Sequence, residues 1–374
     1  MAEGTGLMFD VVYDLFDDLL LEFHRWGDFP VDVKLYILKY LTFPTLRRIM
    51  FLNKECYDLV RKIKPKVDLH LEDVAYSASK NQRKLAKNHD GVKLHIYWRD
   101  PGASLKFVHD YPLIFVKDNE EGCCVQRLMS KKGKFCKRPG IKYSSNTITA
   151  ATKAIFWLSR VLDIQATTIS IRSPNADLQA VLAEQSSSQK IARENFTMCT
   201  NNEPLIIAEF LRFLKPGCGV SVVMGSGTTE LFRGSELFDH EIVRCAQKIS
   251  IDQKVAMTDN QLVRLAAEEI SISAPDITSE VINKLVLEWL EGKRKISSIQ
   301  LHELQTLDLE IILQNVDSTA TMLWKDYVKL ASYQGTWNFE DAPTSVVRGP
   351  QGFLAVRIDT DTNTCMLVDG YSIS

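Results

Sequence analysis

The sequence predicts a mixed α and β protein, with a three-helix unit near the N-terminus followed by an irregular strand–helix array. Three observations predict this class. Apolar residues recur at steps of three and four in the first 65 residues, which is the period of helices. They alternate with polar residues between 66 and 148, which is the period of half-buried strands. From residue 149, short β-like runs recur with helical patterns between them. We therefore divide the chain into residues 1–65, 66–148, 149–315 and 316–374.

The composition is that of an ordinary globular protein, because 45% of the 374 residues are hydrophobic and 25% are charged. At about 100–200 residues per domain, this length allows two or three domains. The formal net charge is −2, so we expect no general attraction to nucleic acid. No apolar run reaches the roughly 18 residues that a membrane span needs. The first residues do not form a signal peptide, because Asp10, Asp14, Asp17 and Asp18 interrupt any apolar core, so we expect reduced thiols and a cytoplasmic location, with a nuclear one as a further option. The eight cysteines have no CxxC spacing and no evident set of four ligands, so we expect no metal or other cofactor.

Residues 8–26 carry an apolar stripe at helical spacing that includes Phe9, Phe16 and Phe23. The polar face of this predicted helix is acidic, whereas helices that lie on membranes carry basic residues there. We expect the helix to pack on its own domain; the alternative is that it docks a partner.

The stretch 29–41 has unusually few charges for a helix of a soluble protein. Pro30 suits the start of a helix, where a missing N–H costs nothing. Two apolar stripes then follow, which are Val33, Tyr36, Ile37, Tyr40 and Leu41, and Val31, Leu35 and Leu38. One stripe can face neighbouring helices, and the other needs a second cover.

Two further short helices follow before residue 65. Pro44 suits the start of one, and Asn53 can cap the other. Three helices in so few residues bury too little surface to be stable alone, since units below about 40 residues usually need help. The uncovered stripe must therefore be buried by the rest of this chain or by another protein.

The segment "FPVDVKLYILKYLTFPTLRRIMFLNKECYDLV" resembles an F-box. That motif opens with Leu-Pro, continues with an Ile-Leu pair and a further Leu, and then has a Leu-rich second helix. The matching residues here are Phe29, Pro30, Ile37, Leu38, Leu41, Leu46 and Ile49. The opening Phe29 departs from the pattern, as does Tyr57, which stands where a Trp is common.

This resemblance implies a substrate-recognition adaptor of an SCF-type ubiquitin ligase. In that family the motif docks a Skp-type adaptor, which links to a cullin and a RING ligase, while the rest of the chain binds a target protein. The residues expected at the docking surface are Phe29, Pro30, Val33, Ile37, Leu38, Leu41, Leu46, Ile49 and Met50. The alternative is a non-ligase interaction scaffold whose N-terminal helices are buried by its own later residues.

Residues 66–148 are expected to be mainly β, with antiparallel strands in "KVDLHL", "VKLHIYW" and "LKFVHDYPLIFV". Residues 127–142 are strongly basic, and their glycines and Pro139 predict a loop. Its cations would suit an acidic or phosphorylated peptide, or a nuclear-import signal; a solvated basic loop is the simpler interpretation. The candidate contact residues are Lys131, Lys132, Lys134, Lys137 and Arg138.

Residues 149–315 contain short β-like runs spaced 21 to 29 residues apart, with centres near Ile169, Phe196, Val220, Ile249, Ile270 and Ile299. A strand-plus-helix unit of this length is the period of leucine-rich-repeat solenoids, although no Asn or Cys ladder is visible. A compact α/β layer domain would satisfy the same pattern. The runs "FLRFLKPGCGVSVVM" and "VLEWLEGKRKISSIQL" resemble the C-terminal region of expanded nematode F-box proteins, of the FTH or F-box-associated type. This implies a substrate-binding module.

Residues 316–374 predict a helix and short strands that cap the array. The sequence holds no HExxH, no GxSxG and no His/Cys pair in a recognisable context, so we do not expect an enzyme. An enzyme on an α/β scaffold is the least supported alternative.

Overall fold

The structure is a computed structural model. It describes residues 26–41, 43–73, 91–99, 108–117, 122–131, 134–137, 141–143, 145–171, 176–200, 204–224, 231–232, 234–331 and 344–369. The chain divides into two compact units, residues 1–192 and 193–374, and each is described by itself. The predicted helix at 8–26 lies outside the described residues.

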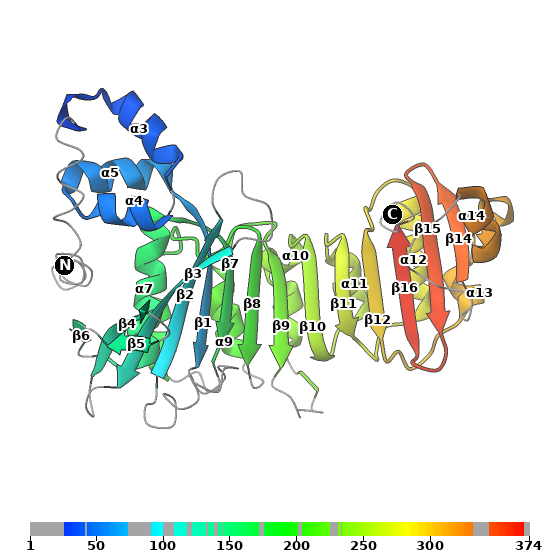
Figure 1. The fold of residues 1–374 in the computed structure, drawn as a ribbon. Coiled ribbons are helices and arrows are strands. Elements are labelled where there is room, and N and C mark those ends of the chain that lie inside the picture. The colour runs from blue at the N-terminus through cyan, green and yellow to red at the C-terminus, as the bar shows by residue number, and fades with distance from the viewer. Residues whose placement is uncertain are drawn as a thin grey trace. The chain divides into compact units, whose positions relative to one another are not determined.

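The first unit begins with a short helical turn and three helices, which confirms the predicted three-helix unit (Figure 1). Both α3 and α4 pack on α5. The Asn53 side chain caps α5 by accepting a hydrogen bond from the Cys56 N–H at 2.8 Å, as the sequence predicts. The elements are η2 (Trp26–Asp28), α3 (Val31–Lys39), α4 (Phe43–Met50) and α5 (Lys54–Ile63).

A sheet follows the helices, with strands in the order β7-β1-β2-β3-β4-β5 and β6 paired to β4. Strand β7 pairs with β1 in parallel, and the other pairs are antiparallel, as predicted for this segment. The helix α7 packs on β2, β3 and β4 and buries one face of the sheet. The elements are β1 (Lys66–Asp73), β2 (Gly91–Arg99), β3 (Val108–Lys117), β4 (Cys123–Lys131), β5 (Lys134–Lys137), β6 (Ile141–Tyr143), α7 (Thr147–Val161), β7 (Asp163–Ser170) and α8 (Ala176–Glu184).

The second unit opens with five parallel strands, β8 to β12, that neighbour one another in chain order. The repeated β-like runs share one row of this sheet, because Phe196, Val220, Ile249, Ile270 and Ile299 are paired in register and buried. The elements are β8 (Asn195–Thr200), α9 (Pro204–Leu211), β9 (Gly219–Met224), η4 (Ser235–Asp239), α10 (Glu241–Arg244), β10 (Lys248–Lys254), α11 (Asp259–Arg264), β11 (Glu269–Ser273), α12 (Ser279–Leu290) and β12 (Ser298–His302).

Antiparallel strands complete the second unit in the order β13-β14-β15-β16, with β16 paired to β12. Helix α14 lies against β13 and β14 at the end of this sheet (Figure 1). The elements are α13 (Leu309–Ile312), η5 (Ser318–Ala320), β13 (Thr321–Leu323), α14 (Trp324–Ala331), β14 (Thr344–Gly349), β15 (Gly352–Asp359) and β16 (Thr364–Asp369). The predicted terminal helix is α14, and the predicted strands "TSVVRG", "FLAVRI" and "CMLVDG" are β14, β15 and β16, whereas the strand predicted at "TWNFE" lies outside the described residues.

Two expectations need correction. The basic segment 127–142 is not a loop, since it holds the end of β4, all of β5 and the first two residues of β6; strand pairing there outweighs its charge and glycines. Strand–helix units do occur from β8 to β12, but the C-terminal part of the chain is a large, mostly β sheet. Because antiparallel strands extend it from β12, it is not clearly leucine-rich-repeat-like.

Candidate functional site

Helix α3 turns one face inward. Leu38 on this face is completely buried, and Lys34 is 3% exposed. The Lys34 ammonium lies 2.7 Å from Oε1 of Glu55 in α5, and 5.8 Å from the centre of the Trp26 ring. A buried ammonium that lost its partner would be costly, so this ion pair fixes how α3 sits on α5.

The rest of α3, together with Phe29 just before it, exposes large apolar side chains. Of the eight large hydrophobic residues that are exposed in the described parts of the chain, five lie between 29 and 40. They are Phe29 (41% exposed), Val31 (46%), Val33 (40%), Tyr36 (63%) and Tyr40 (63%), and we call them the α3 face. Clustered apolar exposure of this kind marks interaction surfaces.

Two tyrosines stand one helical turn apart on the α3 face. Their rings meet edge to face with centroids 5.1 Å apart, and the Tyr40 hydroxyl donates a hydrogen bond to the Tyr36 hydroxyl at 3.2 Å. That hydrogen bond, with a smaller effect of burial, raises the pKa of Tyr40. The pair is therefore held in one arrangement although both rings are exposed.

The predicted docking residues fall into three groups. Phe29, Pro30 and Val33 are exposed, and Ile37 and Leu41 are half-buried. Four others lie in the core of the helical unit, namely Leu38, Leu46, Ile49 and Met50. A partner that docks on this conformation reaches the first group and not the last. The set of docking residues predicted from the sequence did not include Val31, Tyr36 and Tyr40, although Tyr36 and Tyr40 belong to an apolar stripe with helical spacing.

Helix α4 joins the helical unit to the sheet of the first unit. The Phe43 ring packs on Trp98 of β2 with centroids 5.4 Å apart. The Arg47 guanidinium lies 4.5 Å from the ring centre of Tyr111 in β3 and donates a hydrogen bond to its hydroxyl. The three helices therefore share a core with the sheet and are not an independent module.

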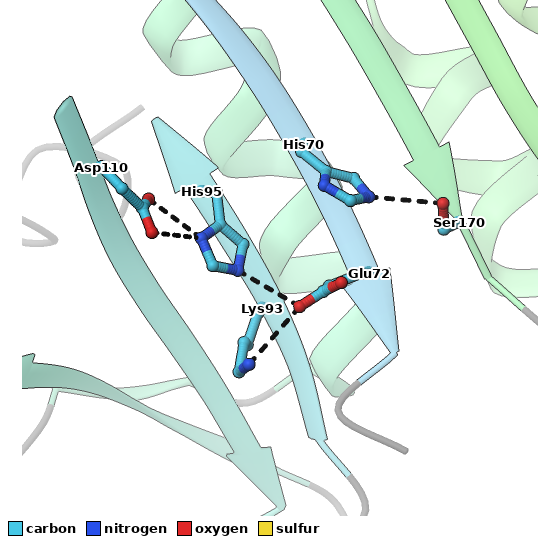
Figure 2. Close-up of polar contacts among 6 residues, drawn as sticks. All are labelled: His70, Glu72, Lys93, His95, Asp110 and Ser170. Carbon is cyan, nitrogen blue, oxygen red and sulfur yellow. Dashed lines mark hydrogen bonds and ion pairs between the residues drawn. The ribbon is translucent and has the colours of Figure 1, made fainter. Parts of the chain in front are cut away.

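A second cluster of polar side chains lies on strands β1, β2 and β3, on the sheet face opposite α7 (Figure 2). Strand alternation puts Glu72, Lys93 and His95 on this face, while the residues between them point into the core. His95 Nδ1 lies 2.9 Å from Asp110, and His95 Nε2 lies 3.2 Å from Glu72. The Lys93 ammonium lies 3.4 Å from the same Glu72 oxygen.

The charges of this cluster hold one another ionised. Burial lowers the pKa of His95, but the hydrogen bonds with Asp110 and Glu72 outweigh it and raise that pKa to about 9. The hydrogen bond from His95 is the main cause that lowers the pKa of Glu72 to about 2. Both ring nitrogens of His95 bind carboxylates, so the imidazolium has no free nitrogen with which to accept a substrate proton. This arrangement braces three strands and does not suit general-base catalysis.

A histidine beside this cluster makes a weaker contact. His70 Nε2 lies 3.4 Å from the Ser170 hydroxyl, and burial lowers the pKa of His70 (Figure 2). No group of three or more His, Cys, Asp or Glu in the described parts of the chain is placed to hold a metal ion. His95 and Glu72 were missed in the sequence because their meeting depends on which strands pair.

The basic candidates cannot be placed as a group. Lys131 lies in β4, and Lys134 and Lys137 lie in β5, where the backbone alone is described. Lys132 and Arg138 lie outside the described residues. Their contact with an acidic or phosphorylated peptide stays a prediction.

Comparison with known proteins matches residues 26–68 to the F-box domain. No curated protein and no solved structure matches the chain. The match covers η2 to α5 and the start of β1, so the α3 face lies within it. F-box domains typically bind Skp-type adaptors, and the presence of such a domain suggests, in general terms, the role of a ubiquitin-ligase substrate adaptor. In the described residues, no helix is both long and apolar enough to span a bilayer.

Proposed function

We propose that this chain is the substrate-recognition adaptor of an SCF-type cullin–RING ubiquitin ligase. The α3 face docks a Skp-type adaptor, and the region that follows the helical unit binds a target protein. The observation that carries this proposal is the exposed α3 face within the segment that matches the F-box domain.

The physical reason for docking is the free-energy cost of leaving the apolar side chains of the α3 face exposed to water. Full burial of one wholly exposed Val or Phe side chain is worth roughly 1.5–3 kcal/mol. The five residues are 40–63% exposed, so covering them would gain part of this value from each and can support an interface. Docking would exclude water from Val33, Tyr36 and the rest of the face. The Lys34–Glu55 ion pair supports this role because it keeps α3 turned with its apolar face outward.

The contribution of the chain to ubiquitin transfer would be positional. Holding a target near a ubiquitin-charged enzyme raises its effective concentration without any catalytic group on this chain. The packing of Phe43 on Trp98 and of Arg47 on Tyr111 supports this role, because it ties the docking helices firmly to the first sheet.

The alternative is a non-ligase scaffold that joins no Skp-type adaptor. One observation favours it, namely that Leu38, Leu46, Ile49 and Met50 are already covered by the chain itself. The alternative requires the α3 face to be covered in cis as well.

Capture of the full chain by a purified Skp-type adaptor separates the two. Val33→Asp puts a charge on the α3 face and should abolish capture. Val223→Asp is the matched control, since Val223 of β9 is also exposed (37%) but lies in the second unit. Equal capture of wild type and Val33→Asp would count against the proposal, and so would a wild-type chain that is not captured at all.

A further inference from the structure

We infer that Lys34 is a positioning residue for docking, because its buried ammonium holds both parts of the α3 face in the orientation that a Skp-type adaptor meets. This inference rests on the proposed function and deepens it, since it makes the affinity for the adaptor depend on a charge that the adaptor does not touch. Lys34 is only 3% exposed, and no docking role was predicted for it from the sequence.

Few buried side chains fix the rotation of α3 about its own axis. Within Val31–Lys39 only Lys34 and Leu38 are buried, and they lie one turn apart on the same side of the helix. Burial of Leu38 stabilises the packing of α3, but the hydrophobic effect is not directional. The Lys34 ion pair is directional, since it keeps Nζ 2.7 Å from Oε1 of Glu55. The ion pair therefore selects the rotation that leaves the α3 face exposed.

The same ammonium holds the turn that precedes α3. Phe29 belongs to the α3 face but lies before the helix, so its position depends on η2. The Lys34 ammonium lies 3.5 Å from the Gly27 carbonyl oxygen and 5.8 Å from the centre of the Trp26 ring. The Phe29 N–H in turn donates a hydrogen bond to the Trp26 carbonyl at 3.3 Å. Lys34 thus joins η2, α3 and α5, and it keeps Phe29 beside the rest of the α3 face.

The energetics of a buried ion pair favour a role in orientation over a role in stability. Taking an ammonium out of water is costly, and an apolar side chain of similar size in its place is often neutral or stabilising. Glu55 lies in the first turn of α5, where the helix dipole favours a negative charge, and its carboxylate is 48% exposed. Water can therefore solvate Glu55 when the Lys34 charge is removed, so we expect the chain to fold without that charge but to hold α3 less strictly.

The experiment measures the Kd of a purified Skp-type adaptor for the full chain and for three single variants, each shown by circular dichroism to be folded at the assay temperature. Lys34→Met removes the charge, and Lys34→Arg keeps it. Lys54→Met is the matched control, because Lys54 is exposed at the start of α5 and outside the α3 face. We expect Lys34→Met to weaken binding about tenfold, as when about a tenth of the molecules hold the competent orientation. Lys34→Arg should restore binding to within about threefold of the wild type, and Lys54→Met should leave the Kd unchanged.

The outcomes distinguish this inference from the proposed function. If the wild type binds, Val33→Asp does not, and folded Lys34→Met binds like the wild type, the positioning role is wrong and the docking face stands. Equal weakening by Lys34→Met and Lys34→Arg would also overturn the role, because the charge would then not matter. If Lys34→Met does not fold, Glu55→Gln removes the other charge of the pair, and an unchanged Kd for that variant would overturn the role. If the wild-type chain does not bind a Skp-type adaptor at all, the proposed function fails first.

Discussion

Arg294 lies just after α12 and connects it to the end of α11. Its side chain is only 9% exposed, and Nε lies 3.0 Å from a carboxylate oxygen of Glu288. The two terminal nitrogens donate to the carbonyls of Leu265 and Val263, at 2.7 and 2.6 Å. Arg294 thus satisfies carbonyls at the C-terminal end of α11, where the helix dipole favours a cation. We predict that Arg294→Met destabilises this part of the second unit strongly.

The magnitude follows from the contacts that the substitution removes. A hydrogen bond that involves a charged group is worth about 1.5–3 kcal/mol, and removing one partner of a buried ion pair costs about 3–5 kcal/mol. These two losses are not additive, because both arise from removing the same charged side chain. The cost to the Glu288 carboxylate is also reduced, since it is 23% exposed and water can solvate part of it. We therefore expect a loss of about 3–5 kcal/mol in the free energy of local opening.

Hydrogen exchange of the full chain, read by mass spectrometry over residues 259–302, measures this loss directly. Amides of α11 and α12 should exchange at least about a hundredfold faster in Arg294→Met. Arg348→Met is the matched control, because Arg348 of β14 is exposed, and it should leave exchange in α11 and α12 unchanged. A change of less than about tenfold, or equal changes in both variants, would refute the role assigned to Arg294.

Two further predictions concern the sheets. The Glu72 pKa is lowered from 4.5 to about 2, so its stabilisation is present above pH 4.5 and is lost as pH falls toward 2. The His95 pKa is raised from 6.5 to about 9, so its stabilisation is present below pH 6.5 and is lost as pH rises through 9. The difference in thermal unfolding midpoint between wild type and His95→Gln should therefore be largest between pH 4.5 and 6.5, and a difference independent of pH would contradict the network. Gly349→Ala should cost about 1–3 kcal/mol in urea unfolding, because the new Cβ would lie 2.6 Å from the buried Trp289 ring; an unchanged midpoint would contradict that close approach.

Local patterns in the sequence predicted the strands well. Alternation in "VKLHIYW" matches β2, and the repeated runs at Phe196, Val220 and Ile249 match β8, β9 and β10. These elements are short, apolar and paired with neighbours that are near in sequence, so local pattern and tertiary packing agree. The cap at Asn53 was predictable for the same reason, since it depends on residues within one turn.

Features that depend on which elements pack together were not predictable. Helix α7 begins with the run Thr147–Thr152, whose only large apolar residue is Ile148, and the helix packs on β2 and β3. The meeting of His95 with Glu72 and Asp110 depends on strand register, which no single segment encodes. The sequence showed that 29–41 has two apolar stripes, but only packing on α5 decides that Leu38 is buried and Tyr36 is exposed.

Hydroxyl-radical footprinting of the full chain with a purified Skp-type adaptor tests the docking of the α3 face most directly. Tyr36 and Tyr40 are exposed in the chain alone, so both should be oxidised readily when it is free. When the adaptor is bound, we predict strong protection of both rings and unchanged oxidation of the exposed Leu323 in the second unit. Equal oxidation of Tyr36 and Tyr40 with and without the adaptor would contradict the proposed docking face.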